Sequence, residues 1–244
     1  MYYGSLRLES AFSPIVDTGN GELRGHAARL IATGKANNHP YETNAVFQLP
    51  NDDDELVFLD RLVRTLHTLN YLTYRGRHSS GLLLLKVHPR HVASVATDHG
   101  LAFEEILRGC GLLPKQITLE LVIDGVEDTA HLTRAISSYA SRGYSIGLDR
   151  LGRHDIDFSL LRKMRPAFVR FDHRLLSSPD PIRPIIKQLH ELGAQVMIKG
   201  LNSATLRADA RENGFDLLQV HTPVRRLLHA PVSSGVPDLG QIAA

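Results

Sequence analysis

The sequence has 244 residues, of which 43% are hydrophobic and 22% are charged, and this length is enough for one complete core. Its 28 basic and 26 acidic residues leave a formal net charge of +2, so overall charge gives no reason to expect nucleic-acid binding. A single cysteine, Cys110, excludes an internal disulfide and a four-cysteine zinc site. No apolar run reaches the roughly 20 residues of a membrane span and no signal peptide is visible, so we expect a cytoplasmic protein without membrane contact.

The first predicted elements are a β-hairpin and a long helix. Residues 5–17 and 22–31 flank the turn sequence TGNG, which indicates a hairpin. A polar loop follows, and three aspartates at 52–54 favour a helix N-terminus. Apolar residues then recur at the helical period, which predicts one buried helix face. They are Leu56, Leu59, Leu62, Val63, Leu66 and Leu69.

From residue 81 onward, short apolar strands alternate with amphipathic helices. The predicted strands are 81–87, 117–123, 145–149, 167–172, 194–199 and 216–220, and helices are expected near 101–111, 128–141, 157–164, 181–192 and 203–213. Strands this apolar are buried on both faces, as in parallel sheets. So many βα units in this length favour an α/β fold of the closed, TIM-like barrel type, with an open doubly wound sheet as the alternative.

The chain is predicted to form one domain over residues 1–230. We find no internal linker in this range. Residues 231–244 are rich in Pro, Gly and Ser, a composition that predicts a flexible C-terminal tail.

Polar side chains stand near the carboxyl end of nearly every predicted strand. These ends meet at the mouth of a βα barrel, where ligands bind. One such residue alone is more often a solvated strand end, but six strands in succession favour a functional site. The set is Lys86, Glu120, Asp149 with Arg150, Arg170 with Asp172, Lys199 and Gln219.

The composition of this set argues against a metal site. Divalent cations in phosphate chemistry need several oxygen ligands, and Lys and Arg supply none. Because buried carboxylates are tolerated only when they are paired, we expect ion pairs to occupy the place of a metal. In these pairs Glu120 and Asp149 would face Lys86, Arg150 and Lys199.

Three histidines, His88, His91 and His99, lie close together in the sequence, so we considered a zinc-binding site. No carboxylate or cysteine stands beside His88 and His91. We therefore interpret His88 and His91 as part of a polar barrel rim.

Several of these segments, taken together, resemble the EAL domain of bacterial cyclic di-GMP phosphodiesterases. They are ITLELVIDG, SIGLDRLGRHDIDFSLLRKM, RPAFVRFDHRLL, QVMIKGLNSATL and NGFDLLQVH, preceded by FSPIVDTGNGELRG. The resemblance runs from about residue 10 to about residue 225. It implies a βα barrel whose first strand is antiparallel, and a two-metal site that hydrolyses cyclic di-GMP at the strand carboxyl ends.

The resemblance also implies that most of the family's catalytic residues are replaced. Ala27 stands at the glutamate of the Glu-Ala-Leu motif, Lys86 at an asparagine ligand, and Arg150 at the second aspartate of Asp-Asp-Phe-Gly. Arg170 stands at the lysine thought to assist the attacking water, and Lys199 at a further glutamate. The family's ligand-binding leucine and arginine fall on Arg29 and Ile31, and the retained, vestigial catalytic positions are Glu120, Asp149, Asp172 and Gln219. We therefore expect no metal, no cofactor and no catalysis.

Three functions remain open from the sequence. The first is a catalytically inactive domain that regulates or binds another protein in trans, and the resemblance leaves room for a homodimer. The second is a metal-independent receptor for cyclic di-GMP or another anionic ligand, with the candidate contacts Lys86, Arg150, Arg170, Lys199 and Gln219. The third is an active cyclic di-GMP phosphodiesterase. The cationic substitutions favour the first.

Overall fold

The computed structural model describes residues 1–75, 81–123, 126–149, 156–177, 182–201 and 203–221. The strands in this part are β1 (Tyr2–Tyr3), β2 (Leu6–Asp17), β3 (Leu23–Gly34), β4 (Pro40–Tyr41), β5 (Leu82–Lys86), β6 (Ile117–Val122), β7 (Ser145–Asp149), β8 (Phe168–Asp172), β9 (Gln195–Leu201) and β10 (Leu217–His221). The helices are α1 (Thr43–Val46), α2 (Asp53–Arg75), α3 (Pro89–Ser94), α4 (Leu101–Gly109), α5 (Thr129–Ser141), α6 (Phe158–Met164), α7 (Arg183–Glu191) and α8 (Ala204–Asn213), with the 3-10 segments η1 (Pro114–Gln116) and η2 (His173–Ser177).

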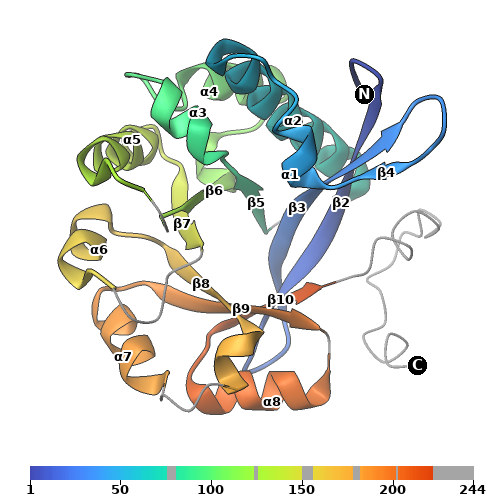
Figure 1. Ribbon diagram of the computed structural model, residues 1–244. Helices are drawn as coiled ribbons and strands as arrows, with labels where there is room; N and C mark the ends of the chain where they lie inside the picture. Colours follow the sequence, from blue (N-terminus) through green and yellow to red (C-terminus); the bar gives the residue numbers. More distant parts are fainter. Residues whose placement is uncertain (76–80, 124–125, 150–155, 178–181, 202, 222–244) are drawn as a thin grey trace.

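Strands β2, β3 and β5 to β10 close into a barrel, and Figure 1 shows the helices arranged around it. β2 pairs antiparallel with both of its barrel neighbours, β3 and β10. From β3 through β5 to β10, the remaining neighbours pair in parallel. The prediction of a TIM-like barrel with one antiparallel strand is therefore confirmed, and the open sheet is wrong. The predicted tail at 231–244 lies outside the described residues.

The predicted hairpin, the long helix and the later strands and helices are all present, but the intervening loops contain more structure than expected. The stretch before α2 includes β4 and α1, whose Val46 is fully buried. The stretch after β5 includes α3, which His88 caps by accepting the Arg90 backbone N–H on its ring. Helices this short carry no readable period, so the sequence could not reveal them. Leu69, predicted to be buried, is 42% exposed.

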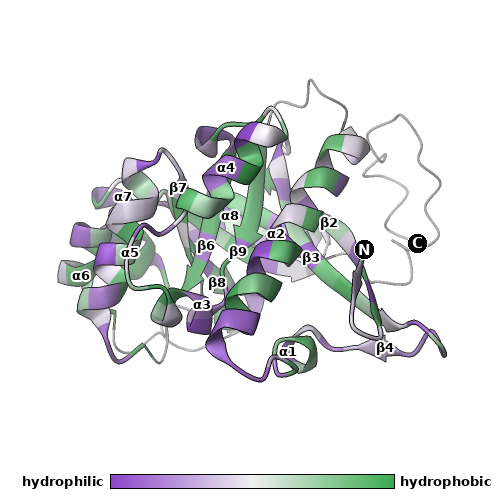
Figure 2. Ribbon diagram, turned by 90° about the horizontal axis from the view of Figure 1, so that it is seen from above, coloured by the Kyte–Doolittle hydropathy of each residue, from purple (hydrophilic) through white to green (hydrophobic). Residues whose placement is uncertain are grey.

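The alternation of side chains along the strands produces separate cores inside and outside the barrel. The interior core consists of Ile15, Ala27, Leu84, Phe168, Met197 and Leu217. A larger core lies between the strands and the surrounding helices, and Figure 2 shows the hydrophobic strands beneath helices of mixed hydropathy. The β2–β3 hairpin extends to a third cluster, which α2 covers with Leu59, Val63 and Leu66. In the described part of the chain, no helix has the length and apolar character needed to span a membrane.

Gly147 on β7 gives the ring of Phe168 its place inside the barrel. A Cβ at Gly147 would lie 2.1 Å from Phe168 Cζ, and the buried ring belongs to the interior core. Because a packed core cannot accept this overlap, we expect Gly147→Ala to lower the free energy of unfolding by about 1–3 kcal/mol in urea denaturation. Gly109→Ala is the matched control, since a Cβ there meets no atom within 4 Å. Equal losses in the two variants would contradict this account.

Candidate functional site

The polar residues near the strand ends form one layer directly above the interior core. Residues two positions apart on a strand share a face, so each inward-facing residue of the interior layer is followed by a polar one toward the mouth. The successive pairs are Leu84 and Lys86, Thr118 and Glu120, Gly147 and Asp149, Phe168 and Arg170, Met197 and Lys199, and Leu217 and Gln219. Strand register then places Lys86 opposite Glu120, Asp149 opposite Arg170, and Lys199 opposite Gln219.

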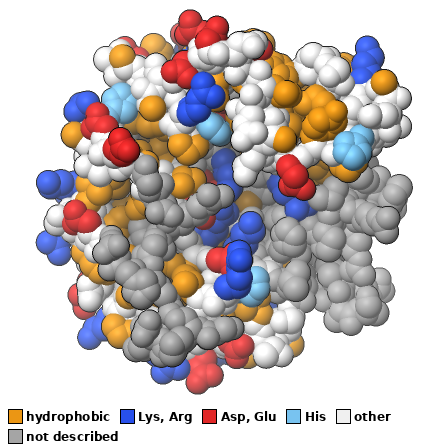
Figure 3. All heavy atoms as spheres, in the orientation of Figure 1, with side chains coloured by type: hydrophobic (Ala, Val, Ile, Leu, Met, Phe, Trp, Pro, Cys, Tyr) orange, Lys and Arg blue, Asp and Glu red, His pale blue; other side chains and the backbone are white. Residues whose placement is uncertain are grey.

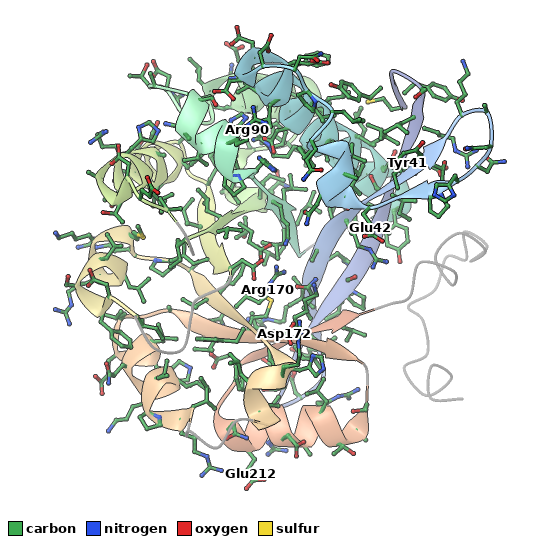
Figure 4. All side chains as sticks on the ribbon, viewed as in Figure 1. Tyr41, Glu42, Arg90, Arg170, Asp172 and Glu212 are labelled. Carbon is green, nitrogen blue, oxygen red and sulfur yellow. The ribbon has the colours of Figure 1, made fainter. Side chains whose placement is uncertain are left out.

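Arg170 is the centre of this layer, and Figure 4 shows it inside the ring of strands. Its Nε donates to Asp149 Oδ1 at 3.1 Å and its Nη2 to Asp149 Oδ2 at 2.7 Å, a bidentate contact. Its Nη1 lies 2.9 Å from Glu120 Oε1 and donates to Gln219 Oε1. All four side chains are buried. One guanidinium therefore joins three neighbours from three other strands.

Lys86 completes the ion pairs on the solvent side. Its Nζ lies 3.2 Å from Asp149 Oδ2 and 3.7 Å from Glu120 Oε2, while 52% of its side chain remains exposed. The predicted pairing of Lys86 with Glu120 and Asp149 is confirmed. Arg150, predicted to take part as well, lies outside the described residues.

The two carboxyl groups respond oppositely to this environment. For Glu120, complete burial outweighs the attraction of Arg170 and Lys86, so its pKa is raised. For Asp149, burial also opposes ionisation, but the charge and hydrogen bonds of Arg170 prevail and hold its pKa well below the usual range. Asp149 is therefore the charged partner of Arg170, and Glu120 is the group in the layer that most readily keeps a proton.

Lys199 does not form the ion pair that the sequence suggested. The half-buried amine has no hydrogen bond or ion pair with any described residue. Burial lowers its pKa, and repulsion from Arg170 and Lys86 lowers it further. The prediction was wrong because Arg170 already lies between the two carboxylates.

Asp172 also departs from the predicted mouth cluster. It lies at the end of β8 and accepts from Arg174 Nε at 2.9 Å and from the Arg174 backbone N–H at 3.0 Å. These contacts with Arg174 lower the pKa of Asp172 to about 2. Asp172 therefore belongs to a local strand-end pair with Arg174.

A cavity of about 390 Å³ opens above the polar layer. Its floor includes Lys86, Glu120, Arg170, Lys199 and Gln219, as expected for a barrel mouth. Its walls come partly from α1, α2 and the start of α3, and include Phe47, Val63 and His88. Figure 3 shows cationic side chains gathered in the hollow of this face.

A second buried polar cluster, which sequence reasoning missed, lies on α2 beside the cavity. Asp60 Oδ2 is 2.7 Å from Arg64 Nη2 and 3.1 Å from His91 Nδ1, and Asp60 Oδ1 accepts the His88 backbone N–H at 2.9 Å. The spacing of Asp60 and Arg64, four residues apart on a helix, was the available signal. His91 is buried, so the polar-rim interpretation is wrong for this residue.

Asp60 is thus a carboxylate close to the histidines, although the sequence shows none beside them. Its charge is bound by Arg64, which leaves it unsuited to act as a zinc ligand. Within the described ranges, no three or more His, Cys, Asp or Glu side chains are grouped to hold a metal ion.

Comparison with solved structures finds the same fold in proteins of low sequence identity. The chain superposes on the PaMucR phosphodiesterase in complex with c-di-GMP with a TM-score of 0.73 and 14% identity, covering 93% of this chain and 97% of that one. A standalone EAL protein from Vibrio cholerae O395, in its c-di-GMP bound form, gives a TM-score of 0.70 and 21% identity, with 88% and 90% covered.

A longer neighbour is matched over part of its length. The YkuI protein of Bacillus subtilis, with an EAL domain and in complex with c-di-GMP and calcium, gives a TM-score of 0.73 and 16% identity. The match covers 96% of this chain and 60% of that protein. No curated protein matches the sequence. The EAL domain model, by contrast, matches residues 5–219, most of the chain. This chain therefore belongs to the EAL domain family.

Proposed function

We propose that this chain is a catalytically inactive EAL domain that acts as a regulatory module in cyclic di-GMP-related signalling, through another protein in trans. The observation that carries the proposal is the position of Arg170, whose guanidinium lies 2.7 Å from Asp149 and 2.9 Å from Glu120. A divalent cation held by these two carboxylates would need the space and the lone pairs that Arg170 uses.

The donor set of the mouth does not fit the two-metal site of an EAL phosphodiesterase. Asp149 is engaged by Arg170 and Lys86, and Glu120 has a raised pKa. Lys86 and Lys199 add positive charge at positions where the family resemblance places metal ligands, and Ala27 has no donor atom. Side-chain cations thus compensate the carboxylates, and we derive no metal-dependent step for this chain.

A metal-independent receptor for an anionic ligand is the second candidate. Its support is the cavity lined by Arg29, Lys86, Arg170 and Lys199, together with neighbours whose structures were solved with c-di-GMP bound. Receptor and regulatory roles are compatible, because ligand binding at the mouth can alter the surface offered to a partner. An active phosphodiesterase is the third candidate, and the ion pairs at the carboxylates argue against it.

Hydrolysis of cyclic di-GMP is the direct test. We expect no linear dinucleotide above the protein-free blank when the purified chain is incubated with Mg²⁺ or Mn²⁺ and the products are separated by chromatography. An active EAL phosphodiesterase assayed in parallel controls for substrate and metal quality. Metal-dependent turnover that survives further purification would refute the proposal.

A further inference from the structure

We propose that the outward face of α2 binds one amphipathic helix of another protein, and that this partner helix carries basic residues beside its apolar face. The inference rests on the proposed function, because it names a surface through which a regulatory module can act in trans. The outward face lies on the side of α2 away from its core and does not line the cavity at the barrel mouth. It consists of Phe58, Leu62, Thr65, Leu69 and Leu72.

The outward face of α2 is uncharged, which is unusual for the solvent side of a surface helix. Such a helix normally places charged and polar residues opposite its buried stripe. On α2, Phe58 is 58% exposed and Leu69 is 42% exposed, and the other three residues of the face are partly buried. Contiguous apolar residues on a surface mark an interaction site. Helix α7 shows the ordinary pattern, because its exposed residues include Lys187, Gln188, His190 and Glu191.

The spacing of the five residues indicates that the occupant is a helix. Successive members of the outward face are four, three, four and three positions apart, which is the a and d pattern of a coiled coil. A row with this period matches the side chains of a second helix, whereas a strand presents one face at every second residue. Thr65 is a small residue between Leu62 and Leu69, so it leaves a hole that a large apolar side chain of the partner helix can fill.

Charges at the border of the outward face determine the chemistry of the partner. Residues 52–55, at the N-terminal end of α2, are all acidic. Asp53 pairs with Arg90, whereas Asp54 is exposed and lies one helical turn before the first apolar residue of the face. Arg61 adds one positive charge along the border, and this end of the face stays negative. Lysine or arginine beside the apolar face of the partner helix would complement these carboxylates.

Fluorescence anisotropy with two labelled synthetic peptides tests the proposal. Each peptide is a helix of about three heptads with leucine at a and d, and the residues at e and g are lysine in one peptide and glutamate in the other. The like charges keep each peptide from pairing with itself. We expect the lysine peptide to bind the unchanged chain at least tenfold more tightly than the glutamate peptide. Phe58→Ser and Leu69→Ser should each weaken binding of the lysine peptide at least tenfold, and Asp54→Lys should reduce the preference for lysine.

Leu113→Ser is the matched control, since Leu113 is 51% exposed but lies outside α2. Thermal unfolding of each variant verifies that it is folded. The proposal is overturned if the lysine peptide does not bind, if both peptides bind equally well, or if Leu113→Ser weakens binding as much as Phe58→Ser.

Sedimentation velocity of the chain alone examines the competing occupant, a second copy of this chain. We expect the sedimentation coefficient to be the same for Phe58→Ser and the unchanged chain. A dimer that Phe58→Ser dissociates would overturn the proposal, because the second copy would then cover the outward face. These outcomes leave the proposed function standing, since metal-dependent hydrolysis is the result that refutes it.

Discussion

Replacing Arg170 with methionine is expected to lower the free energy of unfolding by about 3–5 kcal/mol, the usual cost of removing one partner from a buried ion pair. Arg170 is 2% exposed and Glu120 1%, so water would solvate the carboxylates that the guanidinium leaves behind only poorly. Asp149 would lose two hydrogen bonds, at 2.7 and 3.1 Å. Lys86, whose Nζ lies 3.2 Å from Asp149 Oδ2, would compensate only part of the negative charge that Arg170 leaves unpaired. Urea denaturation measures the loss.

Arg174→Met is the matched control for this experiment. Arg174 also pairs with an aspartate, at 2.9 Å, but its side chain is 84% exposed and water replaces the lost contact. A second variant separates charge from packing: adding Glu120→Gln and Asp149→Asn to Arg170→Met removes the unpaired charges, and we expect it to recover part of the loss. Similar stability of Arg170→Met and the unchanged chain would contradict the central role of Arg170.

The stability of the fold is expected to fall steeply as the pH decreases from about 6.5 to about 4. Burial lowers the pKa of His67, His91 and His99 to about 4 in each case, and all three are at most 4% exposed. In the unfolded chain, a histidine titrates near a pKa of about 6.5. Between these two pKa values the unfolded state binds more protons than the folded state. The neutral histidines therefore contribute their full stabilisation above about pH 6.5, and this contribution is lost as the pH falls. Each histidine contributes a slope of up to about 1.4 kcal/mol per pH unit.

The buried carboxyl groups Asp149 and Glu120 do not reverse this loss of stability on acidification. Asp149 has a lowered pKa, so its contribution is lost only below the unfolded value of about 3.9. Glu120 has a raised pKa and opposes the trend, but it is a single group. The measurement is the free energy of unfolding at several pH values between 7 and 4.5.

His67→Gln should flatten the profile by the share of one histidine. The ring Nδ1 of His67 forms a hydrogen bond with Ser10 Oγ at 2.7 Å. The side-chain amide of glutamine can form the same hydrogen bond and does not titrate. His39→Gln, at an exposed position, is the control and should leave the slope unchanged. An unaltered slope in His67→Gln would mean that this histidine does not stay neutral in the fold.

The sequence by itself determined the α/β class and the position of the polar layer, and it favoured a closed barrel over an open sheet. Apolar strands of five to seven residues alternating with amphipathic helices require a sheet buried on both faces, and the period of two places the residues near the strand ends on the inside. Lys86, Glu120, Asp149, Arg170, Lys199 and Gln219 were therefore assigned to one mouth from their positions alone. The hairpin and α2 followed from turn residues and the helical period.

Only the tertiary structure decided which of these residues meet. Arg170 contacts Gln219 across 49 residues of chain and Lys86 contacts Asp149 across 63, so the pairings depend on strand register and barrel closure. Register brings Arg170 between both carboxylates and leaves Lys199 facing the cavity, whereas the sequence treated all the cations alike. The cluster at Asp60 is a similar case, because burial against α3 turns an ordinary helical pair into a fixed contact with His91. Composition and periodicity determine the face of a strand or helix on which a side chain lies. The residue that it contacts is determined by the packing of segments that are distant in sequence.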